Sequence, residues 1–204
     1  MTDVGLNRRR ALRTLATGVM GAATSSIWVE SLSALARQHA HTQAAQAAIA
    51  AQDWTPGVLS AQQNELVVTL TELIIPETDT PGAKAVRVNR FIDGVLKEAP
   101  AAERESFLRG LTWLDARSKA LFKTDFLGAS PSQQTTLLTR LSSDGNPDKE
   151  DRIGREFFQA IKSITIDGYY TTEVGLRREL GDNGQLFLPQ FQGCDHAEHG
   201  GKGP

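Results

Sequence analysis

The chain has 204 residues, with 22 basic and 24 acidic side chains, and a formal net charge of −2 at pH 7. This balance gives no electrostatic support for binding to nucleic acid. Cys194 is the single cysteine, so no disulfide can form within the chain. The length is sufficient for one domain built around a single hydrophobic core.

An arginine cluster precedes a weakly apolar stretch near the N-terminus. Arg8 and Arg9, followed by residues 14–29 with their interspersed Gly, Ser and Thr, predict a twin-arginine export signal. The stretch is shorter than the roughly 20 apolar residues of a membrane-spanning helix. Ala34-Leu35-Ala36 has the small-x-small pattern of a signal peptidase site. We therefore predict a signal peptide over residues 1–36, cleaved after Ala36, and a periplasmic protein. A retained anchor and a cytosolic helix with a chance arginine cluster are the alternatives.

The first part of residues 37–59 is rich in Ala and Gln. This composition predicts that residues 37–59 form a linker, or a loose helix, before a domain over residues 60–204. Ser60 and Gln63 have the spacing of a capping box and start the first helix of that domain, which Pro76 ends. Apolar residues at helical intervals predict further helices over residues 86–96 and 101–122. The loop at residues 76–83 lies between the first two of these helices. Pro81 biases Thr80 away from helical geometry, so this loop is expected to be stiff.

Ser130 and Gln133 form a second capping-box pattern, with Pro131 at the first helical position. A fifth helix follows, with Ile153, Phe157, Ile161 and Ile164 on one face. Beyond Gly168 the chain becomes irregular, with a short helix near residues 173–180 and a polar tail from residue 192. No run alternates as a strand does over more than a few residues. The prediction is an all-α fold: a small single-domain helical bundle with an irregular C-terminal segment.

Two segments are candidate contact surfaces for a partner protein. The first is the loop, which supplies Thr78, Asp79 and Thr80. The alternative is that this loop only connects two helices. The irregular C-terminal segment holds both tyrosines of the chain, and aromatic side chains bury large areas at interfaces. Its candidates are Tyr169, Tyr170, Phe187, Phe191 and Cys194. The alternative for either tyrosine is local packing against the fifth helix.

The residue types give no catalytic constellation. All four histidines lie in polar stretches, so a serine triad would lack an ordered base: His39 and His41 in the linker, His196 and His199 in the tail. Glycine-rich nucleotide motifs, a P-loop and a haem-attachment motif are absent from the sequence. Glu77 and Asp79 fit solvated turn residues better than an acid/base pair. We therefore expect no catalytic residue and no cofactor on this chain itself.

The C-terminal tail contains residue types that ligate metals. Cys194, His196 and His199 together would suit zinc or copper. A terminal tail ending in Gly, Lys and Pro cannot hold rigid ligand geometry by itself, so we expect no metal site on the chain alone. Ordering of the tail against a partner is the favoured interpretation.

Several segments together resemble the gluconate 2-dehydrogenase subunit 3 family. They are the twin-arginine leader, Leu70-Thr71-Glu72-Leu73-Ile74-Ile75-Pro76-Glu77-Thr78-Asp79-Thr80-Pro81-Gly82-Ala83, Arg90-Phe91-Ile92-Asp93, Gly168-Tyr169-Tyr170-Thr171-Thr172-Glu173-Val174-Gly175 and Gly193-Cys194-Asp195-His196. The resemblance extends over about residues 60–199. The segment around residues 74–83 is its most specific part, because several loop residues match in order.

The resemblance implies a small accessory subunit. Its partner would be a large FAD-dependent sugar or polyol dehydrogenase of the glucose-methanol-choline type, and a c-type cytochrome subunit carrying haem would take the electrons. The large subunit of such a pair lacks an export signal and crosses the membrane through the twin-arginine translocase together with the small one, whose role is then chaperone-like. The C-terminal end is more similar to relatives found beside enzymes associated with glycoside oxidation at the sugar 3-hydroxyl. This similarity argues against gluconate as the substrate and leaves a sugar, a polyol or a glycoside as the substrate class of the complex.

Two other functions are compatible with the residues. One is a free-standing periplasmic metal-binding or redox protein that uses the tail cluster of Cys194, His196 and His199. The other is a periplasmic binding or scaffolding module without a redox partner. Flavin absorbance, metal content and the neighbouring genes would distinguish these possibilities from an accessory subunit.

Overall fold

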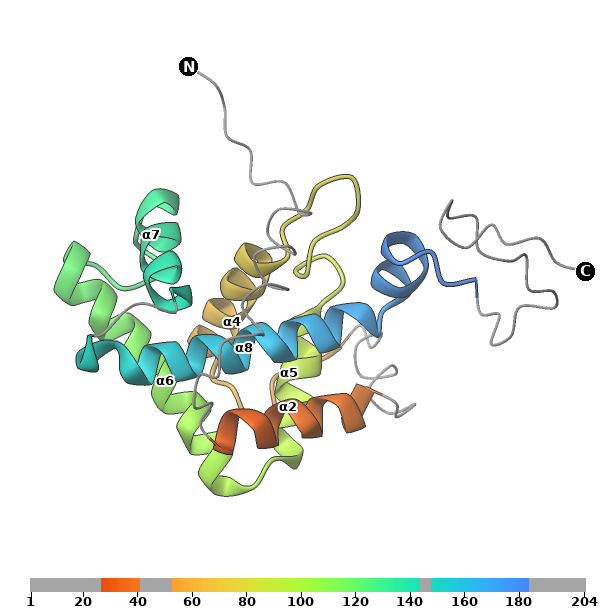
Figure 1. Ribbon diagram of the computed structural model, residues 1–204, viewed down its shortest axis with the longest axis horizontal. Helices are drawn as coiled ribbons and strands as arrows, with labels where there is room; N and C mark the ends of the chain where they lie inside the picture. Colours follow the sequence, from red (N-terminus) through yellow and green to blue (C-terminus); the bar gives the residue numbers. More distant parts are fainter. Residues whose placement is uncertain (1–26, 41–52, 144–147, 184–204) are drawn as a thin grey trace, which may run out of the picture.

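The computed structural model describes residues 27–40, 53–143 and 148–183, and within these ranges the protein is all-α (Figure 1). In chain order the elements are α2 (Ile27–Ala40), α4 (Ala61–Ile74), α5 (Val88–Glu98), α6 (Ala101–Phe122), α7 (Pro131–Ser142), the 3-10 turn η2 (Lys149–Asp151), α8 (Arg152–Tyr170) and the π-helical turn η3 (Val174–Glu179). The described residues contain no strand. The predicted fold class is confirmed.

Both predicted capping boxes are present. Ser60 accepts a hydrogen bond from the backbone N–H of Gln63, whose side chain accepts one from the N–H of Ser60. Ser130 and Gln133 make the same reciprocal pair at the start of α7, with Pro131 in its first turn. Each box satisfies two backbone donors that the helix itself leaves unpaired. These local interactions explain why the starts of α4 and α7 could be placed from the sequence.

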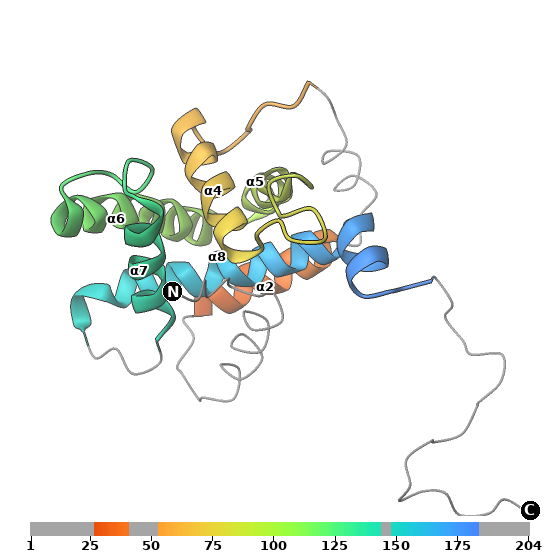
Figure 2. The same cartoon turned by 90° about the horizontal axis from the view of Figure 1, so that it is seen from above.

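Helix α8 is the centre of the bundle. It contacts α2, α4, α5, α6 and α7, and α2 lies directly beneath it in Figure 2. The approach of α6 to α8 is close enough to require glycine: a Cβ at Gly154 would come within 2.0 Å of the Trp113 ring. The apolar side chains between these helices form one core, which includes Phe91, Phe107, Leu111, Phe157, Ile161 and Ile164.

Helix α2 differs from the sequence interpretation, which divided its residues between a signal peptide and a linker. The structure shows one continuous helix over Ile27–Ala40, and its apolar side chains belong to the core. His39 is 6% exposed, packs edge-on against Phe91 and lies 2.9 Å from the Glu98 carboxylate. The expectation that His39 lies in a polar linker is therefore wrong, because α2 buries it against α5.

The pH dependence of stability should reflect Asp167, which faces α2 from the last turns of α8. Desolvation by burial raises the pKa of Asp167, and Arg37 on α2 opposes this with a smaller effect. The folded protein therefore binds this proton more tightly than the unfolded chain does. The stability contributed by the protonated carboxyl is fully present below the ordinary aspartate pKa and is lost as the pH rises through the folded-state value.

We expect Asp167→Asn to raise the melting temperature at neutral pH and to leave it unchanged at a pH below the ordinary aspartate range. Melting curves measured across this pH interval would test the effect. The exposed Asp53→Asn change is the matched control. If Asp167→Asn lowers the melting temperature at neutral pH, the electrostatic attraction between Asp167 and Arg37 outweighs the cost of desolvation.

Candidate functional site

The loop between α4 and α5 is held at both ends by one carboxylate. Glu72 on α4 accepts hydrogen bonds from the backbone N–H of Glu77 at 2.9 Å and of Lys84 at 2.8 Å. The backbone N–H of Ala83 donates to the carbonyl of Ile75 at 2.9 Å and closes the loop at its base. Because a charged acceptor makes stronger hydrogen bonds than a neutral one, Glu72 fixes the loop in one shape.

Gly82 is required by this arrangement. A Cβ at position 82 would lie 2.4 Å from the Glu72 carboxylate and 2.6 Å from the backbone nitrogen of Glu77. Any side chain there would therefore displace the carboxylate that holds the loop. The glycine of the family-like segment thus has a structural role.

The opposite side of the loop is attached to the C-terminal part of the domain. The Tyr169 hydroxyl on α8 donates to the carbonyl of Pro81 at 2.8 Å, and the Thr80 hydroxyl donates to the Glu179 carboxylate of η3 at 2.6 Å. Segments about 90 residues apart in the sequence therefore meet at the C-terminal end of α8, with the loop beside its last turns and η3 directly after them (Figure 1). The predicted stiffness of the loop has its source in these contacts as well as in Pro81.

The residues proposed as partner contacts, apart from Tyr169, fall into three groups. Thr78 and Asp79 are exposed at the tip of the loop, and the Thr78 hydroxyl donates to the Asp79 carboxylate at 2.8 Å. Thr80 and Tyr170 are partly buried. Phe187, Phe191 and Cys194 lie outside the described residues, as do the export-signal arginines Arg8 and Arg9.

Tyr169 is not available at the surface. Its side chain is 0% exposed, its ring packs edge-on against Tyr170, and its hydroxyl is hydrogen-bonded to Pro81. The interpretation of Tyr169 as a contact residue is corrected to the alternative, local packing. Its role is to position the loop, because it joins the loop backbone to α8.

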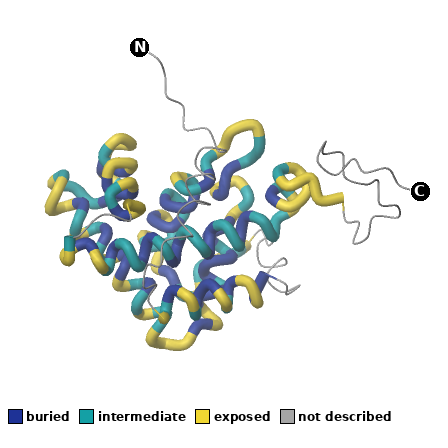
Figure 3. Tube along the Cα trace, viewed as in Figure 1, coloured by how far each residue is buried: buried dark blue, intermediate teal, exposed yellow. Residues whose placement is uncertain are grey.

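Three exposed leucines lie just before the loop and in or directly after η3, and the sequence does not mark them as contact residues. Leu176 is 38% exposed and Leu180, directly after η3, is 61% exposed; Leu73, in the last turn of α4, is 36% exposed. We use the term contact face for four exposed residues of the loop tip and of η3 with its C-cap, namely Thr78, Asp79, Leu176 and Leu180; the Thr80–Glu179 hydrogen bond joins the two segments. Figure 3 shows that exposed chain is present both in the loop and in η3. Helical periodicity alone could not reveal the contact face, since η3 is a π-helical turn of only six residues.

The second family-like segment, residues 90–93, is structural. Asp93 is 4% exposed and accepts three backbone hydrogen bonds, from Gly57 at 2.8 Å, Val58 at 3.0 Å and Leu59 at 2.9 Å. Arg90 lies over the Trp54 ring, 5.3 Å from its centroid. The two side chains thus attach the chain before α4 to the side of α5.

Removing the Asp93 carboxylate should destabilise the domain strongly. Asp93→Ala leaves three backbone donors without their acceptor, and we expect it to lower the free energy of unfolding by about 2–4 kcal/mol. Asp93→Asn should cost less, because one amide oxygen still accepts. Chemical denaturation is the measurement, with the exposed Glu105→Ala change as control. If Asp93→Ala is as stable as the unchanged protein, Asp93 does not stabilise the domain through its hydrogen bonds to residues 57–59.

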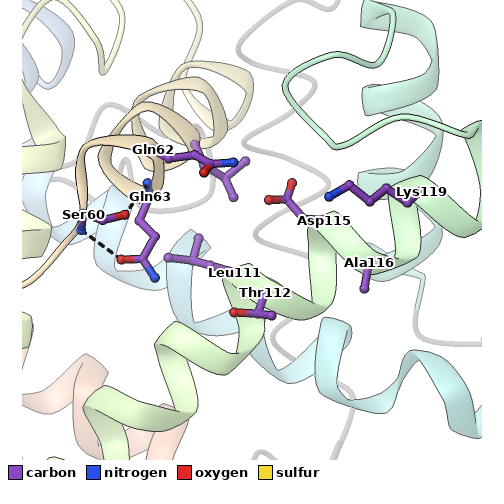
Figure 4. A pocket seen from close by; sticks show the side chains of 9 residues that line it. Ser60, Gln62, Gln63, Leu111, Thr112, Asp115, Ala116 and Lys119 are labelled. Carbon is purple, nitrogen blue, oxygen red and sulfur yellow. Dashed lines mark hydrogen bonds between the residues drawn. The ribbon is translucent and has the colours of Figure 1, made fainter.

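A shallow groove of about 360 Å³ lies between the start of α4 and the middle of α6 (Figure 4). It is lined by Ser60, Gln62, Gln63, Leu66, Leu111, Thr112, Asp115, Ala116 and Lys119. Ser60 and Gln63 are engaged in the capping box, and Asp115 accepts from the backbone N–H of Phe126 at 3.0 Å. These polar groups already have structural roles, so we assign no chemistry to the groove.

The part of the chain that the structure describes holds no group of three or more His, Cys, Asp or Glu side chains placed to bind a metal. The tail candidates Cys194, His196 and His199 lie outside that part. Among the described helices, none combines the length and the apolar character needed to cross a membrane.

We compared the sequence with models of known protein families to find the family to which the chain belongs. The family model described as Gluconate 2-dehydrogenase subunit 3 matches residues 61–183, more than half of the sequence. The chain belongs to the gluconate 2-dehydrogenase subunit 3 family. The match begins at the first residue of α4 and includes the loop, α8 and η3. The family is one of small subunits of dehydrogenase complexes, which function with a larger dehydrogenase subunit. Searches of curated proteins and of solved structures gave no match.

Proposed function

We propose that this chain is the non-catalytic small subunit of a periplasmic FAD-dependent sugar or glycoside dehydrogenase of the glucose-methanol-choline type. In this proposal it supplies the twin-arginine signal that exports the complex, and it stabilises the flavoprotein. The observation that carries the proposal is the family match over residues 61–183. The cluster of Arg8 and Arg9 supports the export role.

The chemistry of the complex belongs to the partner in this proposal. FAD in the large subunit takes the hydride from the sugar, since a flavin performs that step by itself once it is bound and oriented. Haem c in a further subunit accepts the electrons. The small subunit contributes binding surface and no reacting group.

The contact face supports a binding role in physical terms. Its loop is fixed by Glu72, Tyr169 and Glu179 before any partner arrives. A surface that is already ordered pays little conformational entropy when it binds. Exposed leucines beside polar, hydrogen-bonding groups are the composition expected of an interface with an apolar centre and a polar rim.

Replacing the loop tip should weaken the complex without unfolding the subunit. Thr78→Ala combined with Asp79→Ala removes two exposed polar side chains at the tip of the loop, where the Thr78 hydroxyl donates to the Asp79 carboxylate. We expect the dissociation constant for the flavoprotein to rise about tenfold, the size typical of removing one or two interface contacts. Calorimetric titration of the two purified subunits measures this constant.

The matched control is Thr135→Ala with Thr136→Ala on α7, which lies at the other end of the molecule from η3 (Figure 1). Both of these threonines are exposed. Equal affinity of the loop variant and the control variant would confine the loop to connecting α4 and α5. Helicity should be the same in all three proteins.

A further inference from the structure

Helix α2 contains the bond at which signal cleavage was predicted. Ala34, Leu35 and Ala36 lie in the middle of Ile27–Ala40, and the side chain of Ala36 is 0% exposed. The same face of the helix buries Val29, Leu32 and Ala40, which are 5%, 0% and 7% exposed. The three residues with the small-x-small pattern therefore belong to a packed core helix.

Polar contacts fasten α2 along its whole length. The Trp28 indole donates to Glu156 on α8 at 3.3 Å, and the Ser31 hydroxyl donates to Glu103 on α6 at 2.9 Å. Near the other end, His39 lies 2.9 Å from the Glu98 carboxylate of α5. Three different helices thus hold α2, in addition to the apolar contacts with α8.

The twin-arginine route carries proteins that are already folded, so the state of α2 in the folded domain determines whether a protease can reach the bond after Ala36. When the exported chain meets signal peptidase, α2 is therefore docked. Cleavage of the bond after Ala36 would require α2 to leave the core and to open its helix, and proteolysis of a folded protein is limited by such openings. Cleavage there would also remove Val29, Leu32 and Ala36 from the core.

We propose that α2 is retained in the exported protein, so that the leader is cleaved before Ile27 or is not cleaved at all. The inference rests on the proposed export function. Ile27, the first residue of α2 that the structure describes, is 87% exposed, so this end of the helix is accessible to a protease. The sequence just before it supplies small-x-small triplets, Gly21-Ala22-Ala23 and Ala23-Thr24-Ser25.

The first test determines the N-terminus of the chain purified from the periplasm with its partner, by intact mass and N-terminal sequencing. We expect a start between residues 22 and 27, or an intact leader. A start at Arg37, or at any residue of α2 after Ile27, would overturn the proposal. Ala34→Lys is the diagnostic variant, since Ala34 is exposed on α2 yet occupies the third position before the predicted cleavage site. Unchanged processing of Ala34→Lys is expected, whereas a block in processing would place the cut after Ala36.

A second test remains valid if the chain is not exported. Leu32→Ala and Ala34→Lys both lie in the segment that cleavage after Ala36 would remove, but Leu32 is fully buried and Ala34 is exposed. In the purified full-length chain we expect Leu32→Ala to lower the melting temperature by roughly 10 °C and Ala34→Lys to leave it nearly unchanged. Equal melting temperatures would overturn the assignment of α2 to the core. Two results together separate the proposals. If Leu32→Ala is destabilised and the chain nevertheless stays in the cytoplasm, the assignment of α2 to the core stands and the export proposal is wrong.

Discussion

Replacing Arg8 and Arg9 together by lysine should hold both this chain and its flavoprotein partner in the cytoplasm. The twin-arginine route depends on the arginine pair, and the partner is proposed to carry no signal of its own. Loss of one signal should therefore stop the export of two proteins. Fractionation of cells that express both subunits, followed by immunodetection and a dehydrogenase assay of the periplasm, measures the result.

The control keeps the pair and changes a neighbouring arginine. Arg13→Lys makes the same chemical replacement once and should leave export of both subunits intact. In cells that express the Arg8→Lys/Arg9→Lys variant, the flavoprotein should stay in the cytoplasm. If it still reaches the periplasm while this chain is retained, the flavoprotein has its own export route and the escort role is wrong, although the family membership of the chain is unaffected.

Truncation of the tail should abolish the complex while leaving the domain folded. Ending the chain after Asn183 removes residues 184–204, with Phe187, Phe191 and Cys194, and keeps every element that the structure describes. We expect this truncated subunit to retain its helicity and to lose co-purification with the flavoprotein. Because hot-spot contacts at interfaces are enriched in aromatic side chains, the loss should exceed that of the loop variant.

Two comparisons sharpen this experiment. Truncation after Tyr170 also removes η3 and Glu179, the acceptor of the Thr80 hydroxyl, so it should disturb the loop as well. Cys194→Ser should have a smaller effect than either truncation. In limited proteolysis the free subunit should lose its tail near residues 181–184, and the complex should protect it. Equal cleavage in both forms would show that the tail does not lie on the partner.

Local sequence features determined most of the helices. The capping boxes at Ser60 and Ser130 depend on atoms only three residues apart, and both are present as predicted. The helix predicted over residues 101–122 is α6, since its boundaries are set by Pro100 before it and by a left-handed residue, Lys123, after it. The loop between α4 and α5 was likewise placed by Pro76 and Pro81. The family resemblance, based on these and a few further segments, is confirmed by the match over residues 61–183.

Tertiary contacts decided the rest. Helix α2 was divided between a leader and a linker because the arginine cluster and Ala34-Leu35-Ala36 are local signals of an export leader, and only its contacts with α5, α6 and α8 show that it belongs to the core. The roles of Asp93, Glu72 and Tyr169 depend on backbone groups 5 to 88 residues away, and spacing within a helix cannot indicate such partners. The sequence by itself determined where helices start and stop and which family the chain resembles, because those signals are local. Only the folded structure showed which side chains are buried and which hold the loop, because burial depends on what packs against each residue.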